Sequence, residues 1–223
     1  FQGRYAVLQR KTMGSHAFQQ VLGYKNLDEL TERIDRFSYR VLKKDCLDLP
    51  DKSYTVRHVT LTSEQAKMYN DIQRQALLML DNGEMVTAPA VITQFLRLQQ
   101  IMSGHLMSDD KTMMTFPTRR MDALQEILDE HDGKAIIWSR FRHDIKEITA
   151  TLNRTLGPGS AAAYFGDTGD DERQAIVTNF QDPNHPLKFF VGNPATAGYG
   201  LTLTEANLVV YYANDFNLET RIQ

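Results

Sequence analysis

The sequence of 223 residues has one cysteine, Cys46, and this excludes an intrachain disulfide. The six histidines form no cluster with the spacing of metal ligands. No apolar run approaches the roughly 20 residues that a membrane-spanning helix needs. A strong excess of one charge is also lacking, because the net charge is −3, so any nucleic-acid contact must come from a local basic face. We therefore expect a cytoplasmic protein with no metal site and no membrane partner.

The sequence also lacks the motifs of common catalytic sites. It has no G-x-x-x-x-G-K-[ST] loop for nucleotide phosphates and no motif that ties Ser, His and Asp into a nucleophilic site. Gly198 and Gly200 suggest part of a dinucleotide-binding fingerprint, but Leu203 stands where the third glycine belongs. A Rossmann-type cofactor enzyme is therefore a minor alternative, and it predicts dinucleotide binding. We expect no catalytic residue in this chain and no catalysis from the chain alone.

Hydrophobic residues make up 42% of the chain, which is ample for one large domain or for one domain with a helical attachment. From Arg119 onward helical and strand patterns alternate, which is typical of a parallel sheet covered by helices on both faces. We therefore predict an α/β fold. The predicted strands cover residues 134–139, 160–165, 187–191 and 208–212; helices cover residues 121–128 and 141–156, and Thr168 is predicted to cap a third.

The first part of the chain is less regular, and we predict a mainly helical lead-in over residues 1–52. Its best helix follows Asn26, a plausible cap, because apolar residues 27, 30 and 34 share one helical face. Residues 33–44 contain five basic residues and two aromatic ones. This segment suits contact with phosphates and equally suits a solvated helix face, and both interpretations stay open.

Two helices are predicted between the lead-in and the regular part of the chain. Residues 53–61 alternate in polarity as a strand does. Thr62 and Gln65 then form a capping box, which predicts a helix reaching Leu80, and a second helix is predicted over residues 90–102. Residues 103–118 read as a loop.

The segment between the last two predicted strands is the main candidate site. Glycines allow a ligand to approach the main chain closely, and the threonines beside them supply hydroxyl groups. In open parallel sheets, ligands bind at the carboxyl ends of the strands, so the residues directly after each strand are candidates too. These residues are rich in small polar groups and poor in acids and bases. We therefore expect the site to hold an anion, either a nucleotide phosphate or a nucleic-acid backbone, and not to break a covalent bond.

Four stretches carry a resemblance to a known family: Lys134-Ala-Ile-Ile-Trp-Ser-Arg-Phe141, Tyr164-Phe-Gly-Asp-Thr168, Ala197-Gly-Tyr-Gly-Leu-Thr-Leu-Thr-Glu-Ala206 and Tyr211-Tyr-Ala-Asn-Asp-Phe-Asn217. In order and spacing they resemble motifs of the second RecA-like lobe of superfamily 2 helicases, specifically the SNF2-like ATP-dependent DNA translocases of phages and bacteria. Residues 21–30 and 39–50 resemble the helical insertion and linker that join the two lobes. The resemblance implies a RecA-like C-terminal lobe over residues 53–223, after a linker or insertion region over residues 1–52.

The resemblance also implies roles for single residues. The expected nucleic-acid-binding residues are Ser139, Arg140, Gly166, Thr196, Gly198, Tyr199, Gly200 and Thr202. Asp215 and Asn217 are expected at the interface between the two lobes. Capping of a helix is an equally simple explanation of both residues.

Several family features are absent. There is no first lobe with its ATP-gripping loop, Ala195 stands where many relatives have arginine, and the chain stops at Gln223, where motif VI is expected to begin. The resemblance implies that a longer protein binds ATP and Mg mainly through its N-terminal ATPase lobe, and that this chain alone binds neither. The expected partners are that lobe and DNA, with RNA not excluded. A non-enzymatic nucleic-acid or protein interaction domain on the same fold is the alternative, and the sequence upstream of Phe1 would decide between them.

Overall fold

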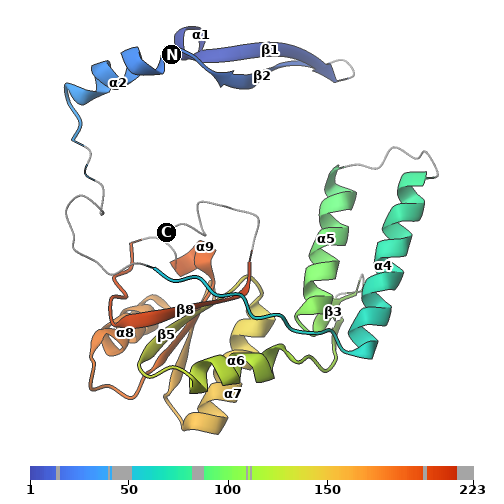
Figure 1. The fold of residues 1–223 in the computed structure, drawn as a ribbon, viewed down its shortest axis with the longest axis vertical. Coiled ribbons are helices and arrows are strands. Elements are labelled where there is room, and N and C mark those ends of the chain that lie inside the picture. Colours follow the sequence, from blue (N-terminus) through green and yellow to red (C-terminus); the bar gives the residue numbers. More distant parts are fainter. Residues whose placement is uncertain are drawn as a thin grey trace. The chain divides into compact units, whose positions relative to one another are not determined.

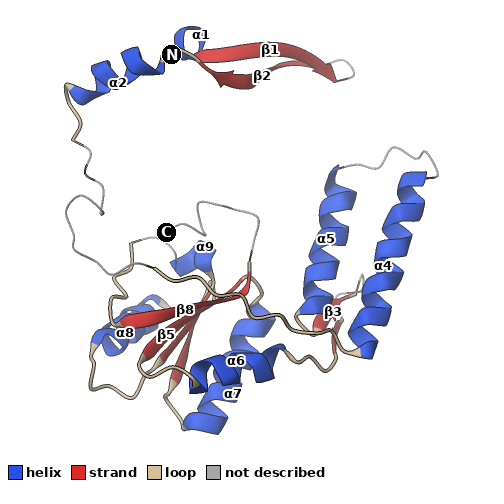
Figure 2. Cartoon of the chain, in the orientation of Figure 1, coloured by secondary structure: helices blue, strands red, loops and turns tan. Residues whose placement is uncertain are grey.

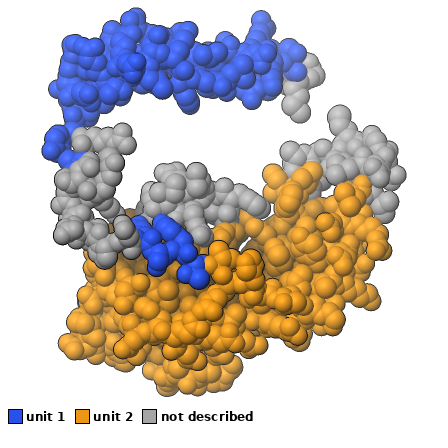
Figure 3. Space-filling model, in the orientation of Figure 1, with its two compact units in different colours: residues 1–55 blue, residues 56–223 orange. Residues whose placement is uncertain are grey.

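The computed structural model describes residues 1–13, 16–39, 41, 52–81, 88–108, 110, 112–197 and 200–214. Residues 40 and 42–51 lie outside the described residues, and they include most of the predicted linker and a third of the basic segment. The chain divides into two compact units, unit 1 of residues 1–55 and unit 2 of residues 56–223 (Figure 3). The functional border that we predict between residues 52 and 53 stays a prediction.

Unit 1 combines a β-hairpin with short helices. Its described elements are α1 (Gln2–Tyr5), β1 (Ala6–Met13), β2 (His16–Tyr24) and α2 (Leu27–Asp35) (Figure 1). Strands β1 and β2 are antiparallel, with Ala6 opposite Tyr24 and Met13 opposite His16. The prediction of a mainly helical lead-in is therefore wrong for residues 6–13 and 16–24, where the backbone groups of the two strands pair, and the helix after Asn26 is confirmed.

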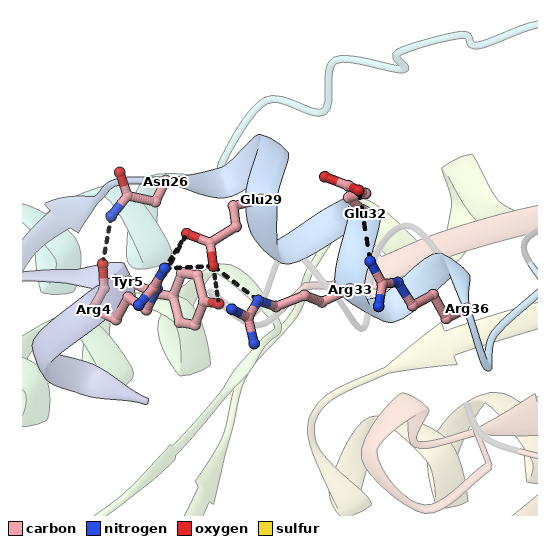
Figure 4. A network of polar contacts seen from close by, with 7 residues as sticks. All are labelled: Arg4, Tyr5, Asn26, Glu29, Glu32, Arg33 and Arg36. Atoms are coloured by element: carbon pink, nitrogen blue, oxygen red, sulfur yellow. Dashed lines mark hydrogen bonds and ion pairs between the residues drawn. The ribbon is translucent and has the colours of Figure 1, made fainter.

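A polar network joins α1 to α2 within unit 1 (Figure 4). The carboxylate of Glu29 accepts hydrogen bonds from Arg4 Nε at 3.1 Å and from Arg33 Nε at 2.8 Å. Asn26 occupies the N-cap position in the left-handed conformation, with φ of 53°, but its side chain makes no capping hydrogen bond. Asn26 Nδ2 instead donates to the carbonyl oxygen of Arg4 at 2.9 Å. The predicted side-chain cap is therefore wrong, because this amide binds the backbone of α1.

Unit 2 is built on a four-stranded parallel sheet in the order β6-β7-β5-β8. Figure 2 shows β5 and β8 of this sheet in red, with blue helices beside them. The strands are β5 (Lys134–Ser139), β6 (Ala161–Tyr164), β7 (Phe189–Gly192) and β8 (Ala206–Ala213). Helices α6 (Arg120–Asp129), α7 (Arg142–Leu156), α8 (Asp170–Gln181) and the short α9 (Pro194–Ala197) connect or precede them. The predicted α/β fold with a parallel sheet flanked by helices is confirmed.

The sheet carries a hydrophobic core on each face. On one face Ile137 and Val191 pack with Ile148 of α7, in a cluster that also includes α6. On the other face Ile136 and Phe190 pack with residues of α8. Neighbouring residues of a strand point to opposite faces, so the continuous apolar runs of β5 and β7 serve both cores.

Helices α4 (Ser63–Asp81) and α5 (Ala88–Met102) lie side by side next to the sheet (Figure 1). The capping box is confirmed, because Gln65 N–H donates to Thr62 Oγ1 at 3.2 Å and Thr62 N–H donates to Gln65 Oε1 at 3.0 Å. A hairpin of β3 (His105–Met107) and β4 (Met113–Thr115) follows α5. The predicted loop over residues 103–118 thus contains two short strands.

Two further predictions are wrong. Residues 52–62 form no strand, and Tyr54 and Val56 are 81% and 73% exposed, because no neighbouring strand pairs with this segment. Thr168 does not cap α8, since Gly169 occupies the N-cap position. The Thr168 hydroxyl instead accepts from Phe165 N–H and donates to the carbonyl oxygen of Ala163, both at 3.2 Å.

Within the described residues, no helix has the length and apolarity needed to cross a membrane.

Candidate nucleic-acid interface

The candidate site is the carboxyl edge of the sheet, which we define as the residues that directly follow the four strands. Strands β5, β6, β7 and β8 end at Ser139, Tyr164, Gly192 and Ala213. All four strands run parallel, so these ends lie along the same side of the sheet. This is where ligands bind in open α/β sheets, as we predicted from the sequence.

Asn193 joins three parts of this edge. Its backbone N–H donates to the carbonyl oxygen of Tyr164 at 3.1 Å, and its Nδ2 donates to the carbonyl oxygen of Arg140 at 3.0 Å. Its Oδ1 accepts a hydrogen bond from Ala195 N–H in α9 at 2.8 Å. The sequence analysis counted Asn193 among the candidates that directly follow a buried strand, but it assigned this residue no nucleic-acid contact.

Gly192 permits the close approach of β6 and β7 at the edge. A Cβ at this position would lie 2.9 Å from ring atoms of both Phe190 and Trp138, and 3.2 Å from the carbonyl oxygen of Tyr164. Such contacts are too short for a side chain to be added without displacing its neighbours. The glycine therefore lets the chain leave β7 tightly against β6, and this places Asn193.

Arg140 is half-buried and is held at the edge by several contacts. Its Nη1 donates to Gln99 Oε1 in α5 at 3.1 Å, and its backbone N–H donates to the carbonyl oxygen of Ala213 at 3.2 Å. The guanidinium carbon also lies 6.0 Å from the ring centroid of Phe141. The structure thus places the predicted cation at the edge and adds Gln99, which the sequence analysis did not select.

Ser139 is fully buried, unlike the other described candidates. Its hydroxyl donates to Asp144 Oδ2 at 2.8 Å and accepts from Phe141 N–H at 3.3 Å. Both contacts lie inside the protein. The placement supports a role in fixing the end of β5, and the nucleic-acid contact that we expected for Ser139 stays a prediction without support from its geometry.

Gly166 is exposed and lies between two arginines. Arg142 Nη1 pairs with Asp167 Oδ1 at 2.9 Å, and Arg173 Nη2 donates to the carbonyl oxygens of Phe165 and Gly166 at 3.2 and 3.3 Å. The sequence placed both arginines in helices but gave no indication that they reach this loop. Cationic side chains from α7 and α8 therefore hold the loop after β6.

The main candidate loop is described only in part, since Gly198, Tyr199, Asp215 and Asn217 lie outside the described residues. Thr196 lies in α9, half-buried, and its backbone N–H donates to the carbonyl oxygen of Asn193 at 3.0 Å. Gly200 has φ of 74°, a conformation that favours glycine, and Thr202 is exposed. Thr196 thus lies close behind β7, while Gly200 and Thr202 belong to the segment between α9 and β8.

Tyr212 lies one residue before the end of β8. Burial raises the pKa of its phenol, and the Arg120 guanidinium, 4.5 Å from the ring centroid, opposes this effect. The phenol therefore stays neutral at physiological pH and adds no charge to the edge.

The same residues do not fit an ATP–Mg site. Within the described part of the chain, no group of three His, Cys, Asp or Glu side chains is suited to hold a metal ion. The sequence has no phosphate-gripping G-x-x-x-x-G-K-[ST] loop. The donor set of the carboxyl edge consists of amides, hydroxyls and arginines, which are groups that bind phosphate oxygens.

A family model for the helicase conserved C-terminal domain matches residues 119–223. This range contains the whole parallel sheet and all of its carboxyl edge. The match covers the four stretches on which the resemblance rests.

Curated proteins and solved structures agree with this match. The chain is 23% identical over 203 residues to the putative ATP-dependent helicase/translocase YwqA of Bacillus subtilis, covering 86% of this chain and 22% of that protein. It is similar to the C-terminal domain of a Sulfolobus solfataricus SWI2/SNF2 ATPase, with 25% identity and a TM-score of 0.54 over 69% of this chain and 68% of that one. The core of the Sulfolobus ATPase in complex with double-stranded DNA is 29% identical, with a TM-score of 0.54 over 83% of this chain and 40% of that one.

The chain is short in comparison with the curated proteins. It spans 10% of the length of one matched relative and 41% of another. The activity of a whole protein therefore does not transfer directly to these 223 residues.

Proposed function

Because this chain belongs to the SNF2-like proteins of helicase superfamily 2, as their C-terminal RecA-like lobe, we propose that it binds the DNA backbone along its carboxyl edge. In the longer protein it closes on an N-terminal ATPase lobe. That lobe supplies most of the ATP site, and cycles of closing and opening move the two lobes along DNA. The protein works in the cytoplasm.

The arrangement around Asn193 supports this proposal most directly. One side chain joins the strand end that carries Arg140 to the helix that carries Thr196. Two motifs that lie more than 50 residues apart in the sequence, and that are both predicted to contact the backbone, are thereby held on one edge. Backbone amides, hydroxyls and a cation on one rigid edge are the groups that bind phosphates in nucleic acids.

Proteins of this family use ATP with Mg. The chemistry that ATP supplies is phosphoryl transfer to water, and positioning and charge stabilisation by both lobes accelerate it. In this chain the carboxyl edge holds and orients DNA. No step of hydrolysis is assigned to its residues.

The test is DNA binding by the 223-residue chain, measured as fluorescence anisotropy of a labelled duplex between 50 and 200 mM salt. We expect affinity that falls with salt, and a clear loss in a Thr196→Ala, Thr202→Ala variant. Thr178→Ala is the matched control, because the Thr178 hydroxyl bonds only to Gln174 in its own helix α8. Equal affinity of the wild-type chain, the double variant and the control would contradict the proposal, and an RNA duplex in the same titration shows whether the edge prefers DNA.

A second measurement separates the motor from a non-enzymatic interaction domain. The 223-residue chain should hydrolyse no ATP above a buffer blank, and measured hydrolysis would defeat that claim. The longer protein should show DNA-stimulated ATPase activity, which the Thr196→Ala, Thr202→Ala variant weakens. An intact longer protein with no ATPase activity would favour the interaction domain.

A further inference from the structure

We propose that Gln99, on helix α5, is a positioning residue that holds Arg140 ready for a phosphate of the DNA backbone. This inference rests on the function proposed above and adds to it a residue from outside the helicase C-terminal match, which begins at residue 119. It assigns a role in DNA binding to the α4–α5 arm, by which we mean helices α4 and α5.

The amide of Gln99 connects the ends of two neighbouring strands. Its Oε1 accepts a hydrogen bond from Arg140 Nη1 at 3.1 Å, and its Nε2 donates to the carbonyl oxygen of Asn214 at 3.4 Å. Arg140 directly follows β5 and Asn214 directly follows β8. Both bonds require the same orientation of the amide, so the contact to Asn214 fixes the oxygen toward Arg140.

Buried polar groups bring the segment after α5 close to the same strand end. His105, directly after the two-residue turn that follows α5, is 1% exposed, and its Nδ1 lies 3.3 Å from Asp144 Oδ1. The other carboxylate oxygen of Asp144 accepts the hydroxyl hydrogen of Ser139, the neighbour of Arg140. The buried hydroxyl of Ser139 thus ties the end of β5 to Asp144 of α7, the residue that His105 approaches.

The other helix of the arm is fixed as well. Gln65 is 1% exposed and its Nε2 donates to the carbonyl oxygen of Ile101 at 2.8 Å and to that of Met102 at 3.3 Å. These are the last two residues of α5. The start of α4 therefore holds the end of α5, the helix that carries Gln99.

A neutral partner suits this role. An arginine side chain loses many conformations when it binds a phosphate, and a group that orders it beforehand reduces this loss. A carboxylate would also order Arg140 but would neutralise its charge. In the described part of the chain Arg140 forms no ion pair, so the amide of Gln99 orders the guanidinium and leaves its positive charge available.

A double-mutant cycle with Arg140→Gln, Gln99→Ala and the combined variant tests the proposal. Binding of the 223-residue chain to a labelled DNA duplex is measured by anisotropy at several salt concentrations. Arg140→Gln should weaken binding and reduce the slope of log affinity against log salt by about 0.9, the value for one phosphate contact. Gln99→Ala should weaken binding about three- to tenfold, and the combined variant should bind no more weakly than Arg140→Gln.

Two further variants separate positioning from a structural effect. Gln99→Glu should bind DNA more weakly than Gln99→Ala, because its carboxylate competes with the phosphate for Arg140, and a merely structural role predicts the opposite order. Gln100→Ala is the matched control, since the neighbouring amide contacts Met107 N–H and not the carboxyl edge. It should bind DNA as the wild-type chain does. Unfolding midpoints followed by the fluorescence of Trp138 verify that each variant is folded.

A measurement without DNA keeps the two proposals distinguishable. The side-chain Nε–Hε resonance of Arg140 is identified by its loss in Arg140→Gln, and its heteronuclear NOE reports the order of the guanidinium. We expect this NOE to fall in Gln99→Ala and to stay high in Gln100→Ala. An unchanged NOE in Gln99→Ala, or additive losses of affinity in the cycle, would overturn the role of Gln99. If the NOE falls in Gln99→Ala but every variant binds DNA as the wild-type chain does, the result would contradict the proposed function and leave the contact between Gln99 and Arg140 intact.

Discussion

Units 1 and 2 differ in how their apolar side chains are shielded from water. In the described part of unit 1 the buried hydrophobic residues are Tyr5 and Ala6, while Leu22, Tyr24 and Leu27 are exposed. In unit 2 hydrophobic clusters cover both faces of the sheet. Burial of apolar surface is the dominant favourable contribution to folding. This contribution is therefore large in unit 2 and small in the described part of unit 1.

The difference shows what holds each unit together. An isolated hairpin is marginally stable in water, and helix α2 of nine residues is too short to be stable alone. Within unit 1 the network around Glu29 joins these pieces, and it is exposed to solvent. Exposed ion pairs contribute little, so we expect unit 1 to respond to pH and salt and unit 2 to respond to changes of packing.

The largest difference should appear on truncating one isoleucine in each unit. Ile148→Ala removes a fully buried side chain of α7 and should lower the free energy of unfolding by about 2–5 kcal/mol. Ile34→Ala removes a side chain of α2 that is 38% exposed and should change it by about 0.5 kcal/mol or less. Urea unfolding followed by Trp138 fluorescence measures both, and similar losses would show that the two units share one core.

The next effect concerns Lys134, whose ammonium group binds the end of α8. Nζ donates to the carbonyl oxygens of Phe180 at 2.8 Å and Asp182 at 2.6 Å, and the residue is buried. Lys134→Met leaves these carbonyls without their donor and should lower the free energy of unfolding by about 1–3 kcal/mol. Lys188→Met, at an exposed position, is the control and should have almost no effect. Equal effects of the two changes would show that the hydrogen bonds of Lys134 do not stabilise unit 2.

The two units also differ in how their helices begin. Thr62→Ala removes the capping box of α4 in unit 2 and should cost about 1 kcal/mol in the urea experiment. Asn26→Ala in unit 1 removes no capping bond, so it should leave the stability of unit 2 unchanged and loosen only the contact with Arg4. Amide hydrogen exchange at the start of each helix locates the effect. Loss of protection in α2 equal to that in α4 would show that Asn26 caps after all.

The smallest effect is a pH response of unit 1. The hydrogen bond from Arg4 lowers the pKa of Glu29, and the charge of Arg4 and the bond from Arg33 act in the same direction. The folded pKa lies below the unfolded one, so this stabilisation is present above about pH 4.3 and is lost as the pH falls through the folded pKa. NMR titration of the Glu29 carboxyl carbon should show the lowered pKa. The pKa should rise toward the ordinary value in Arg4→Gln, where Arg33 still lowers it, and an unchanged pKa in that variant would show that Arg4 is not the cause.

The sequence predicted correctly those elements that depend only on residues close together in the chain. The buried runs of β5 and β7 and the capping box at Thr62 follow from apolar composition and from neighbouring side chains. Predictions failed where the outcome depends on a distant partner. Residues 53–61 alternate like a strand but have no strand to pair with. Residues 6–13 pair with residues 16–24 in a hairpin that no helical or turn signal revealed.

The same division holds for the candidate site. The sequence indicated that Arg140, Gly166 and Thr196 follow buried strands or lie close behind them, and the parallel sheet brings them to one edge. It could not show that Ser139 is buried, since a serine at a strand end has the same sequence signal whether it faces solvent or Asp144.

The sequence by itself determined the parallel α/β architecture, the position of the candidate loop and the family, because each depends on runs of neighbouring residues. Only the tertiary structure decided which polar groups meet across the sheet. These contacts join residues that lie 41 to 115 positions apart: Asn193 contacts Arg140, and Gln99 contacts both Arg140 and Asn214. Such pairs leave no local periodicity, because the packing of α5 and the order of the strands bring them together.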